Sequence, residues 1–307
     1  MNRECVMADY NQLIDTAKSI GCDFILNEPM KKHTTFRIGG PCDIMLMPET
    51  RAQAISVIKA CRNLNFDYII IGNGSDIVFG SGGYHGAVVC MCRLNSIKVE
   101  NTSVYCDAGV SMSALCNAAL ENALTGAERL FGIPGTVGGA VCMNAGAYGG
   151  QVGDILVSCD YYDGENIVTV PVSDMELSYR HSLFSDGSKA VLGARFEFKQ
   201  GDKAEIRKAM TDYIERRKSK QPVEYPSAGS VFLRPEGHFA GALVEQCGFK
   251  GKCVGDAQVS EKHCGFIINK GNATSSDVKN LVADIKRKVL CEKGVSLQCE
   301  IKFIGED

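Results

Sequence analysis

The chain has 307 residues, of which 45% are hydrophobic and 22% are charged, and its formal net charge is −3. These proportions are typical of a soluble globular protein, and the length predicts two domains of about 150 residues each. The slightly acidic charge argues against a general nucleic-acid-binding surface, and no apolar run approaches the ~18 residues that a membrane span needs.

The fifteen cysteines do not form a recognisable metal or disulfide pattern. No CxxC pair occurs, and Cys90 and Cys92 would point to the same side of a strand, which suits packing. The five histidines show no HxH or HExxH spacing, so no metal site is expected. Many unpaired thiols, together with the charged residues Arg3, Glu4 and Asp9 where a signal segment would be apolar, predict a cytoplasmic protein.

The N-terminal two thirds mix helical and strand patterns without a regular βαβ repeat, which predicts an α+β fold. Helices are expected over 8–20, from Thr50 onward and over 111–124, and strands over 42–47, 67–71, 86–92, 103–109 and 190–198. Residues 154–170 are expected to form a β-hairpin that turns at Asp163-Gly164.

The C-terminal third begins at the boundary Gly201-Asp202 and predicts a second α+β unit. A periodic helix ending in RRKSK comes first, and a helix over 275–293 has its N-cap among Thr274, Ser275 and Ser276. Further expected elements are a strand around Ser230, a helix at FAGALVEQC, the strand GFIIN and a final strand over 297–305.

The most informative segment is GIPGTVGGAVCMNAGAYGG, residues 132–150. Seven glycines and no charged residue let a flat or phosphorylated ligand lie against the backbone, whose N–H groups can bind anions. A string of tight turns is the alternative. Turns are usually polar, however, and this segment interleaves its glycines with apolar residues, so a ligand cradle is favoured.

A second glycine loop, IGNGSD over 71–76, follows a buried strand directly. It lacks the third glycine of a dinucleotide-binding fingerprint, and the chain has no GKS or GKT phosphate loop. Taken alone, this loop is as consistent with a tight turn as with a ligand-binding loop. Together with the first loop, it indicates two cradles for one extended cofactor that contains phosphate.

Three isolated polar residues are candidates for chemistry. Arg180 stands between apolar neighbours in LSYRHSLF, where either an anionic ligand or a structural salt bridge would explain it. Ser230 enters a strand in PSAGSVF without a nucleophile elbow, and a turn-forming serine is the alternative. Glu300 lies on the polar face of the final strand, where a solvated side chain is the ordinary interpretation.

In order and spacing, the motifs GNGSD, GIPGTVGGAVCMNAGAYG, SYRHSLF, RKSKQP, AGSVF and LQCEIKFIG resemble the UDP-N-acetylenolpyruvoylglucosamine reductase family, over about residues 34–305. The resemblance implies a two-lobed FAD-binding domain of the p-cresol methylhydroxylase type, followed by a smaller α+β substrate-binding domain. The implied boundaries are 1–30 for an N-terminal helix and lead-in, 31–200 for the FAD domain with lobes 31–91 and 92–200, and 201–307 for the substrate domain.

The resemblance also implies non-covalent FAD and NADPH as the reductant. The residues that it assigns to FAD binding are Gly72, Asn73, Gly74, Ser75, Asp76, Gly132, Ile133, Pro134, Gly135, Thr136, Gly138, Gly139, Asn144 and Gly146. Family members commonly have asparagine at the position of Asp76, and a carboxylate cannot donate to phosphate as an amide does.

The implied reaction is reduction of the enolpyruvyl ether of a nucleotide sugar, with Ser230 as proton donor and Arg180 and Glu300 stabilising the enolate. Tyr148, Arg217, Lys220 and Arg234 are the implied substrate-binding residues. The chain resembles the shorter branch of the family, which lacks a substrate-covering tyrosine loop. It has Arg234 where the longer branch has asparagine. A monomer or weak oligomer without nucleic-acid or membrane partners is expected. A flavin oxidase and a non-catalytic nucleotide-sugar sensor are the alternatives.

Overall fold

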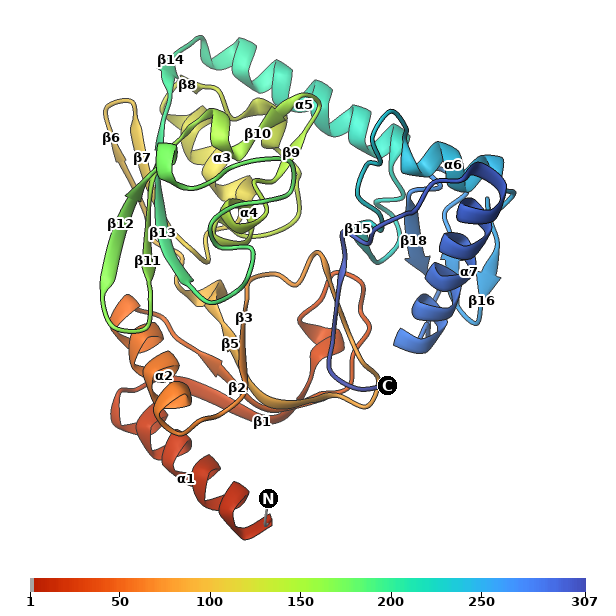
Figure 1. Cartoon of the computed structure of the whole chain (residues 1–307). Coiled ribbons are helices and arrows are strands. Elements are labelled where there is room, and N and C mark those ends of the chain that lie inside the picture. The colour runs from red at the N-terminus through yellow and green to blue at the C-terminus, as the bar shows by residue number, and fades with distance from the viewer. Residues whose placement is uncertain (1–2) are drawn as a thin grey trace. The chain divides into compact units, whose positions relative to one another are not determined.

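The computed structural model describes residues 3–307, with side chains from Tyr10 onward (Figure 1). Residues 1–2, the start of the expected N-terminal segment, lie outside this description. Helices and sheets alternate irregularly along the chain, and most strand pairs are antiparallel. No helix among the described residues is long and apolar enough to cross a membrane.

The chain divides into two compact units that are interleaved in sequence. The first contains the chain up to Leu26, Asp43–Gly72 and Gly86–Glu215, and the second contains Asn27–Cys42, Asn73–His85 and Arg216–Asp307. Two short N-terminal segments therefore belong to the same compact unit as the C-terminal third. The boundaries expected from the sequence, after residues 30, 91 and 200, divide the chain into consecutive segments and did not anticipate this exchange.

The first unit begins with helix α1 (Arg3–Ser19) and a four-stranded sheet. The strands are β1 (Asp23–Pro29), β2 (Pro41–Met47), β5 (Tyr84–Cys90) and β3 (Tyr68–Ile71), in that order across the sheet. Helix α2 (Arg51–Asn63) packs against α1, and Thr50 caps it by accepting a hydrogen bond from the Gln53 backbone N–H. Strand β3 ends at Ile71, directly before the loop that begins at Gly72.

A five-stranded sheet forms the rest of this unit. Its strands run in the order β12 (Ile167–Pro171), β11 (Leu156–Tyr162), β13 (Ala190–Glu197), β7 (Ser103–Asp107) and β6 (Ile97–Glu100). The predicted hairpin is β11 and β12, in which the Asp163 carboxylate accepts from the N–H groups of Glu165 and Asn166. Helices α3 (Met112–Glu121) and α4 (Val137–Cys142) pack together, and α4 contacts β13 and β7.

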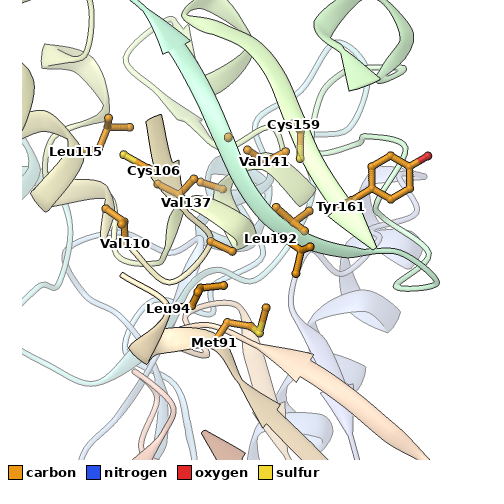
Figure 2. Packing of buried hydrophobic residues seen from close by; sticks show 14 of the residues in the cluster. Met91, Leu94, Cys106, Val110, Leu115, Val137, Val141, Cys159, Tyr161 and Leu192 are labelled. Carbon is orange, nitrogen blue, oxygen red and sulfur yellow. The ribbon is translucent and has the colours of Figure 1, made fainter. Parts of the chain in front are cut away.

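The core of the first unit joins these helices to the sheet (Figure 2). Val137 and Val141 of α4 are fully buried, in one cluster with Leu192 of β13 and Cys106 of β7. The buried cysteines pack as small apolar residues, as expected, and burial raises the pKa of the Cys61 thiol to about 12. Because α4 is fixed in this core, the residues on either side of it are held in place.

The second unit has its own core and a four-stranded antiparallel sheet. The strands run in the order β15 (Ser227–Ser230), β18 (Phe266–Asn269), β17 (Ala257–Val259) and β16 (Cys253–Val254). Helices α6 (Ala240–Gln246) and α7 (Ser275–Lys293) pack together (Figure 1), and α7 contacts β16 and β17. Thr274 and Asp277 form a capping box at the start of α7, at the predicted position.

The last strand is shorter than the sequence predicts. Strand β19 covers only Lys302–Ile304 and pairs in parallel with β4 (Ile77–Phe79). Residues 297–301 instead form a single bridge, between Cys299 and Phe232, and two backbone hydrogen bonds to residues 231–233. Regular pairing therefore does not extend back to Leu297.

The remaining elements are short apart from the helix that follows residue 202. They are α5 (Lys203–Lys220), β8 (Leu124–Thr125), β9 (Gly146–Ala147), β10 (Gly150–Gln151), β14 (Lys199–Gln200) and the 3-10 turns Met30–Lys32, Met91–Arg93, Glu128–Leu130, Val152–Asp154 and Val172–Asp174. The run RRKSK forms the last turns of α5, where the sequence predicted the helix to end.

Candidate functional site

The glycine-rich segment 132–150 folds around the short helix α4 of the first unit. Thr136 caps this helix, with its Oγ1 accepting from the Gly139 N–H at 3.5 Å. The N–H groups of Val137 and Gly138 donate to the carbonyls of Val110 and Ala108, so both point to neighbouring backbone. Gly138 thus serves close packing, since a Cβ there would lie 3.0 Å from the Ala108 Cβ.

The first residue of the other glycine loop lies directly against this cap. A Cβ on Gly72 would overlap the Thr136 Oγ1 and come within 2.9 Å of its Cγ2. Thr136 is only 2% exposed, so it has no room to move aside. Gly72 therefore packs so closely against the Thr136 side chain that only glycine fits at this position.

Residues 73–76 of the second glycine loop belong to the second unit. Gly74 has a φ of +56°, and a Cβ there would overlap the His33 carbonyl oxygen, so this position also requires glycine. Asp76 is half-buried, and its carbonyl accepts from the Lys302 N–H at 2.9 Å. Burial raises the pKa of the Asp76 carboxyl above its ordinary value, and the nearby Lys302 charge opposes this shift.

Arg180 lies at the tip of a tight turn in the first unit. Ser178 and His181 exchange backbone hydrogen bonds of 3.1 and 3.3 Å, which leaves Tyr179 and Arg180 as the two turn residues. The φ of Arg180 is +57°, a conformation that favours glycine or asparagine. Its guanidinium Nη2 donates to the Gly146 carbonyl at 3.4 Å and its Cζ lies 5.0 Å from the Tyr179 ring centroid.

Two further residues of the glycine segment, Asn144 and Tyr148, contact neighbouring side chains and backbone. The Asn144 side chain is 1% exposed and hydrogen-bonds to Gly153, Gln151 and Ser178. The Tyr148 ring stacks on Tyr213 of α5, with centroids 5.4 Å apart. The sequence did not indicate the pairing of these two rings, because local spacing cannot show which ring lies opposite Tyr148.

Ser230 and Glu300 come together in the second unit. The Glu300 N–H donates to the carbonyl of Val231, the residue that follows Ser230, at 2.8 Å. The register of β15 against β18 shifts between Ser227 and Ser230, around Gly229 with a φ of +75°. Such a bulge redirects the next side chain, and bulges are frequent beside active sites. The Gly-Ser step in the sequence was the signal for it.

The three expected cationic substrate ligands differ in exposure. Arg217 is 7% exposed and its Nη1 donates to Gln221 Oε1 at 3.0 Å, whereas Lys220, one turn further along α5, is exposed. Arg234 is exposed, with its Cζ 4.8 Å from the Phe239 ring centroid. Within residues 10–307, no three His, Cys, Asp or Glu side chains gather as metal ligands.

Two separate parts of the chain match known protein families. Residues 42–169 match the FAD binding domain family, and residues 221–304 match the C-terminal domain of UDP-N-acetylenolpyruvoylglucosamine reductase. A protein of that name from Clostridium kluyveri is 44% identical over 286 residues, which is 93% of this chain and 94% of the relative. The chain belongs to the UDP-N-acetylenolpyruvoylglucosamine reductase family.

Two further relatives agree with this membership. A UDP-N-acetylenolpyruvoylglucosamine reductase from Caldanaerobacter subterraneus is 44% identical over 297 residues, covering 96% of this chain and 98% of its own. The crystal structure of the reductase MurB from Thermus caldophilus superposes with a TM-score of 0.77 at 32% identity, over 92% of this chain and 98% of that one. The predicted fold, an FAD-binding domain followed by an α+β domain, is thereby confirmed, and this UDP-N-acetylenolpyruvoylglucosamine reductase family member is an FAD-dependent oxidoreductase.

Proposed function

We propose that the protein reduces the enolpyruvyl ether of UDP-N-acetylglucosamine enolpyruvate to UDP-N-acetylmuramate, a step of peptidoglycan synthesis, with NADPH as reductant. The observation that carries the proposal is the presence of serine, arginine and glutamate at the three matched positions. Ser230 follows a β-bulge, Arg180 occupies a left-handed turn, and Glu300 lies beside Ser230.

The glycine segments fit FAD because they leave backbone where side chains would otherwise stand. Gly72 and Gly74 let their loop pack against Thr136 and the His33 carbonyl, which fill the space of a side chain. The other glycines of the two segments would leave main-chain N–H groups open to a phosphate. When bound, FAD would supply the hydride chemistry that links NADPH to the β-carbon of the enolpyruvyl group. The protein supplies binding, position and charge.

Arg180 would stabilise the negative charge that develops on the substrate carboxylate when the double bond is reduced. A guanidinium remains protonated at neutral pH and offers paired donors, which suit a carboxylate. Glu300, if protonated or linked through water, would add a further donor to the same charge. Holding Arg180 at the tip of a tight turn limits the reorganisation needed when that charge forms.

Ser230 would donate the proton that the α-carbon takes up. A serine hydroxyl is a weak acid, so this transfer requires a strongly basic carbanion and stabilisation of the alkoxide that remains. Arg217 and Lys220, on consecutive turns of α5, would bind the nucleotide diphosphate, and Tyr148 and Arg234 would contact the rest of the substrate. The proton donor and the cationic residues thus have separate tasks.

The test is the visible spectrum of the purified protein followed by steady-state turnover. We expect a yellow protein that oxidises NADPH only when UDP-N-acetylglucosamine enolpyruvate is present. A protein that stays colourless after incubation with FAD would contradict the flavin assignment. Oxygen consumption with sugar or alcohol substrates and no turnover of the enolpyruvyl substrate would instead support the flavin oxidase.

A further inference from the structure

The turn that carries Arg180 is fastened to the glycine segment by the side chain of Asn144. The Asn144 Nδ2 donates to the Ser178 carbonyl at 3.0 Å, and the same carbonyl accepts the His181 N–H that closes the turn. Its second donor goes to Gln151 Oε1 at 3.2 Å, and its Oδ1 accepts from the Gly153 N–H at 3.0 Å. Both amide hydrogens and the amide oxygen are therefore used inside the protein.

The other end of the turn is tied to the same segment. The Ser182 Oγ, in a residue that is 1% exposed, donates to the Cys142 carbonyl at 2.7 Å, and the Ser185 Oγ donates to it at 3.3 Å. Arg180 itself reaches the Gly146 carbonyl. Cys142 is the last residue of α4, whose Val137 and Val141 are anchored in the core (Figure 2).

These hydrogen bonds are needed because the backbone conformation of Arg180 is one that arginine does not favour. Arg180 has a positive φ without being glycine or asparagine, a conformation that persists only where the surroundings impose it. Asn144 also has a positive φ, of +40°, which asparagine tolerates better than most residues. Asn144, whose side chain helps to impose the turn, therefore occupies a backbone conformation that suits asparagine.

We propose that Asn144 is a positioning residue for Arg180 rather than a ligand of FAD. Its amide fixes the Ser178 carbonyl, and through it the Tyr179-Arg180 turn, relative to the rigid helix α4. This inference rests on the proposed function in one respect, which is the proposed action of Arg180 on the substrate. Misplacing a catalytic group by about 1 Å can cost on the order of 100-fold in rate, so a second residue is needed to hold it.

The test is the variant Asn144→Asp, which keeps the shape and the tolerance of positive φ but removes both amide donors. We expect flavin content and the rate of flavin reduction by NADPH to stay within about threefold of the parent. Reoxidation of the reduced flavin by the enolpyruvyl substrate should fall about 100-fold, as a loss in kcat with the KM for NADPH unchanged. Asn122→Asp is the matched control, because the Asn122 Nδ2 also donates to a backbone carbonyl, that of Ala118, on an exposed helix end.

A double variant separates positioning through Arg180 from other roles. In an Arg180→Ala background, Asn144→Asp should lower the rate of flavin reoxidation by less than about threefold, because the side chain that Asn144 positions is already absent. Full additivity of the two losses, an unchanged rate in the single variant, or loss of FAD from it would each overturn the proposal.

Hydrogen exchange needs no substrate, so it tests the positioning role of Asn144 even if the proposed function is wrong. Amide hydrogen exchange of residues 178–182 should be faster in Asn144→Asp than in the parent, and unchanged in Asn122→Asp. If the parent does not turn over the enolpyruvyl substrate but the exchange changes as expected, the proposed function fails and the positioning contact stands. Unchanged exchange would overturn the positioning role itself.

Discussion

Gly72 and Thr136 lie so close together that no side chain can be added to Gly72 without striking the threonine hydroxyl. The contact joins the residue after strand β3 to the residue that caps helix α4, 64 positions further along the chain. Both residues belong to the segments that the sequence indicates as cofactor cradles, and the contact fixes the spacing between these two segments at this point.

Gly72→Ala should weaken FAD binding at least 10-fold, because the new methyl group must displace buried Thr136 or the loop itself. Flavin content of the purified variant and titration of the apoprotein with FAD measure this. Gly271→Ala, where a Cβ would lie 3.4 Å from Asp256 Oδ2, is the control for an uncrowded glycine and should bind FAD as the parent does. Equal FAD affinity in both variants would show that the contact does not shape the cradle.

Adding Thr136→Ala to Gly72→Ala should recover part of the lost FAD affinity. The overlapping Oγ1 is then removed, and the nearest threonine atom that remains is the Cβ at 3.1 Å. Recovery is expected to be incomplete, since loss of the helix cap costs about 1 kcal/mol of stability. No recovery at all would mean that Gly72 is required for a reason other than Thr136.

Ser230→Ala should keep flavin reduction by NADPH but reduce turnover of the enolpyruvyl substrate by several orders of magnitude, because only the proton donor is lost. Stopped-flow measurement of the two half-reactions distinguishes these effects. Ser227→Ala, on the same strand and before the bulge, is the matched control and should leave both half-reactions within about threefold of the parent. Normal turnover by Ser230→Ala would refute the role of proton donor.

Features that depend on neighbouring residues were predicted from the sequence. Thr50 and Thr274 cap α2 and α7 at the predicted positions, because a cap needs only the next three residues. The prediction of a final strand was wrong for residues 297–301. There, two hydrogen bonds replace a regular ladder: the Glu300 N–H donates to the Val231 carbonyl, and the Leu233 N–H donates to the Gln298 carbonyl. Alternating apolar residues cannot reveal whether a partner strand is available.

Contacts between distant segments could not be predicted. Asn144 and Ser178 are 34 residues apart, and the family resemblance assigns the asparagine to FAD binding without indicating its contact with the Arg180 turn. Its three hydrogen bonds depend on where two turns meet, which no local pattern encodes. The same holds for residues 27–42 and 73–85, whose place in the second unit follows from packing of Phe36, Ile38 and Val78 in that core.

The left-handed backbone of Arg180 predicts an unusual order of stability. Arg180→Gly should be more stable than Arg180→Ala by about 1 kcal/mol, because only glycine adopts this φ without strain. At Arg207, inside helix α5, the order should be reversed by about 1 kcal/mol, since alanine is the better helix former. Chemical denaturation of the four variants measures both differences, and the same order at both positions would contradict a strained turn.

Asp76 should oppose FAD binding when it is ionised. A carboxylate cannot donate to a phosphate and carries the same sign of charge, whereas an amide can donate. Asp76→Asn should therefore bind FAD several-fold more tightly than the parent, as measured by titration of the apoprotein. Asp284→Asn removes one negative charge from the exposed surface of α7, where Asp284 pairs with Arg287, and should leave FAD affinity unchanged.

The pH dependence of these variants tests the ionisation directly. Burial raises the pKa of Asp76 in the folded protein above its unfolded value, so ionisation disfavours the folded state, and stability falls as the pH rises through the ordinary carboxyl range and the raised pKa. Asp76→Asn cannot ionise, so its gain in stability over the parent should be small at low pH and grow as the pH rises through that window. Denaturation midpoints of the parent, Asp76→Asn and Asp284→Asn between pH 4 and 8 measure this gain. A gain that shrinks with rising pH would show that the carboxylate is stabilised in the folded protein, as the opposing Lys302 charge would do if it outweighed burial.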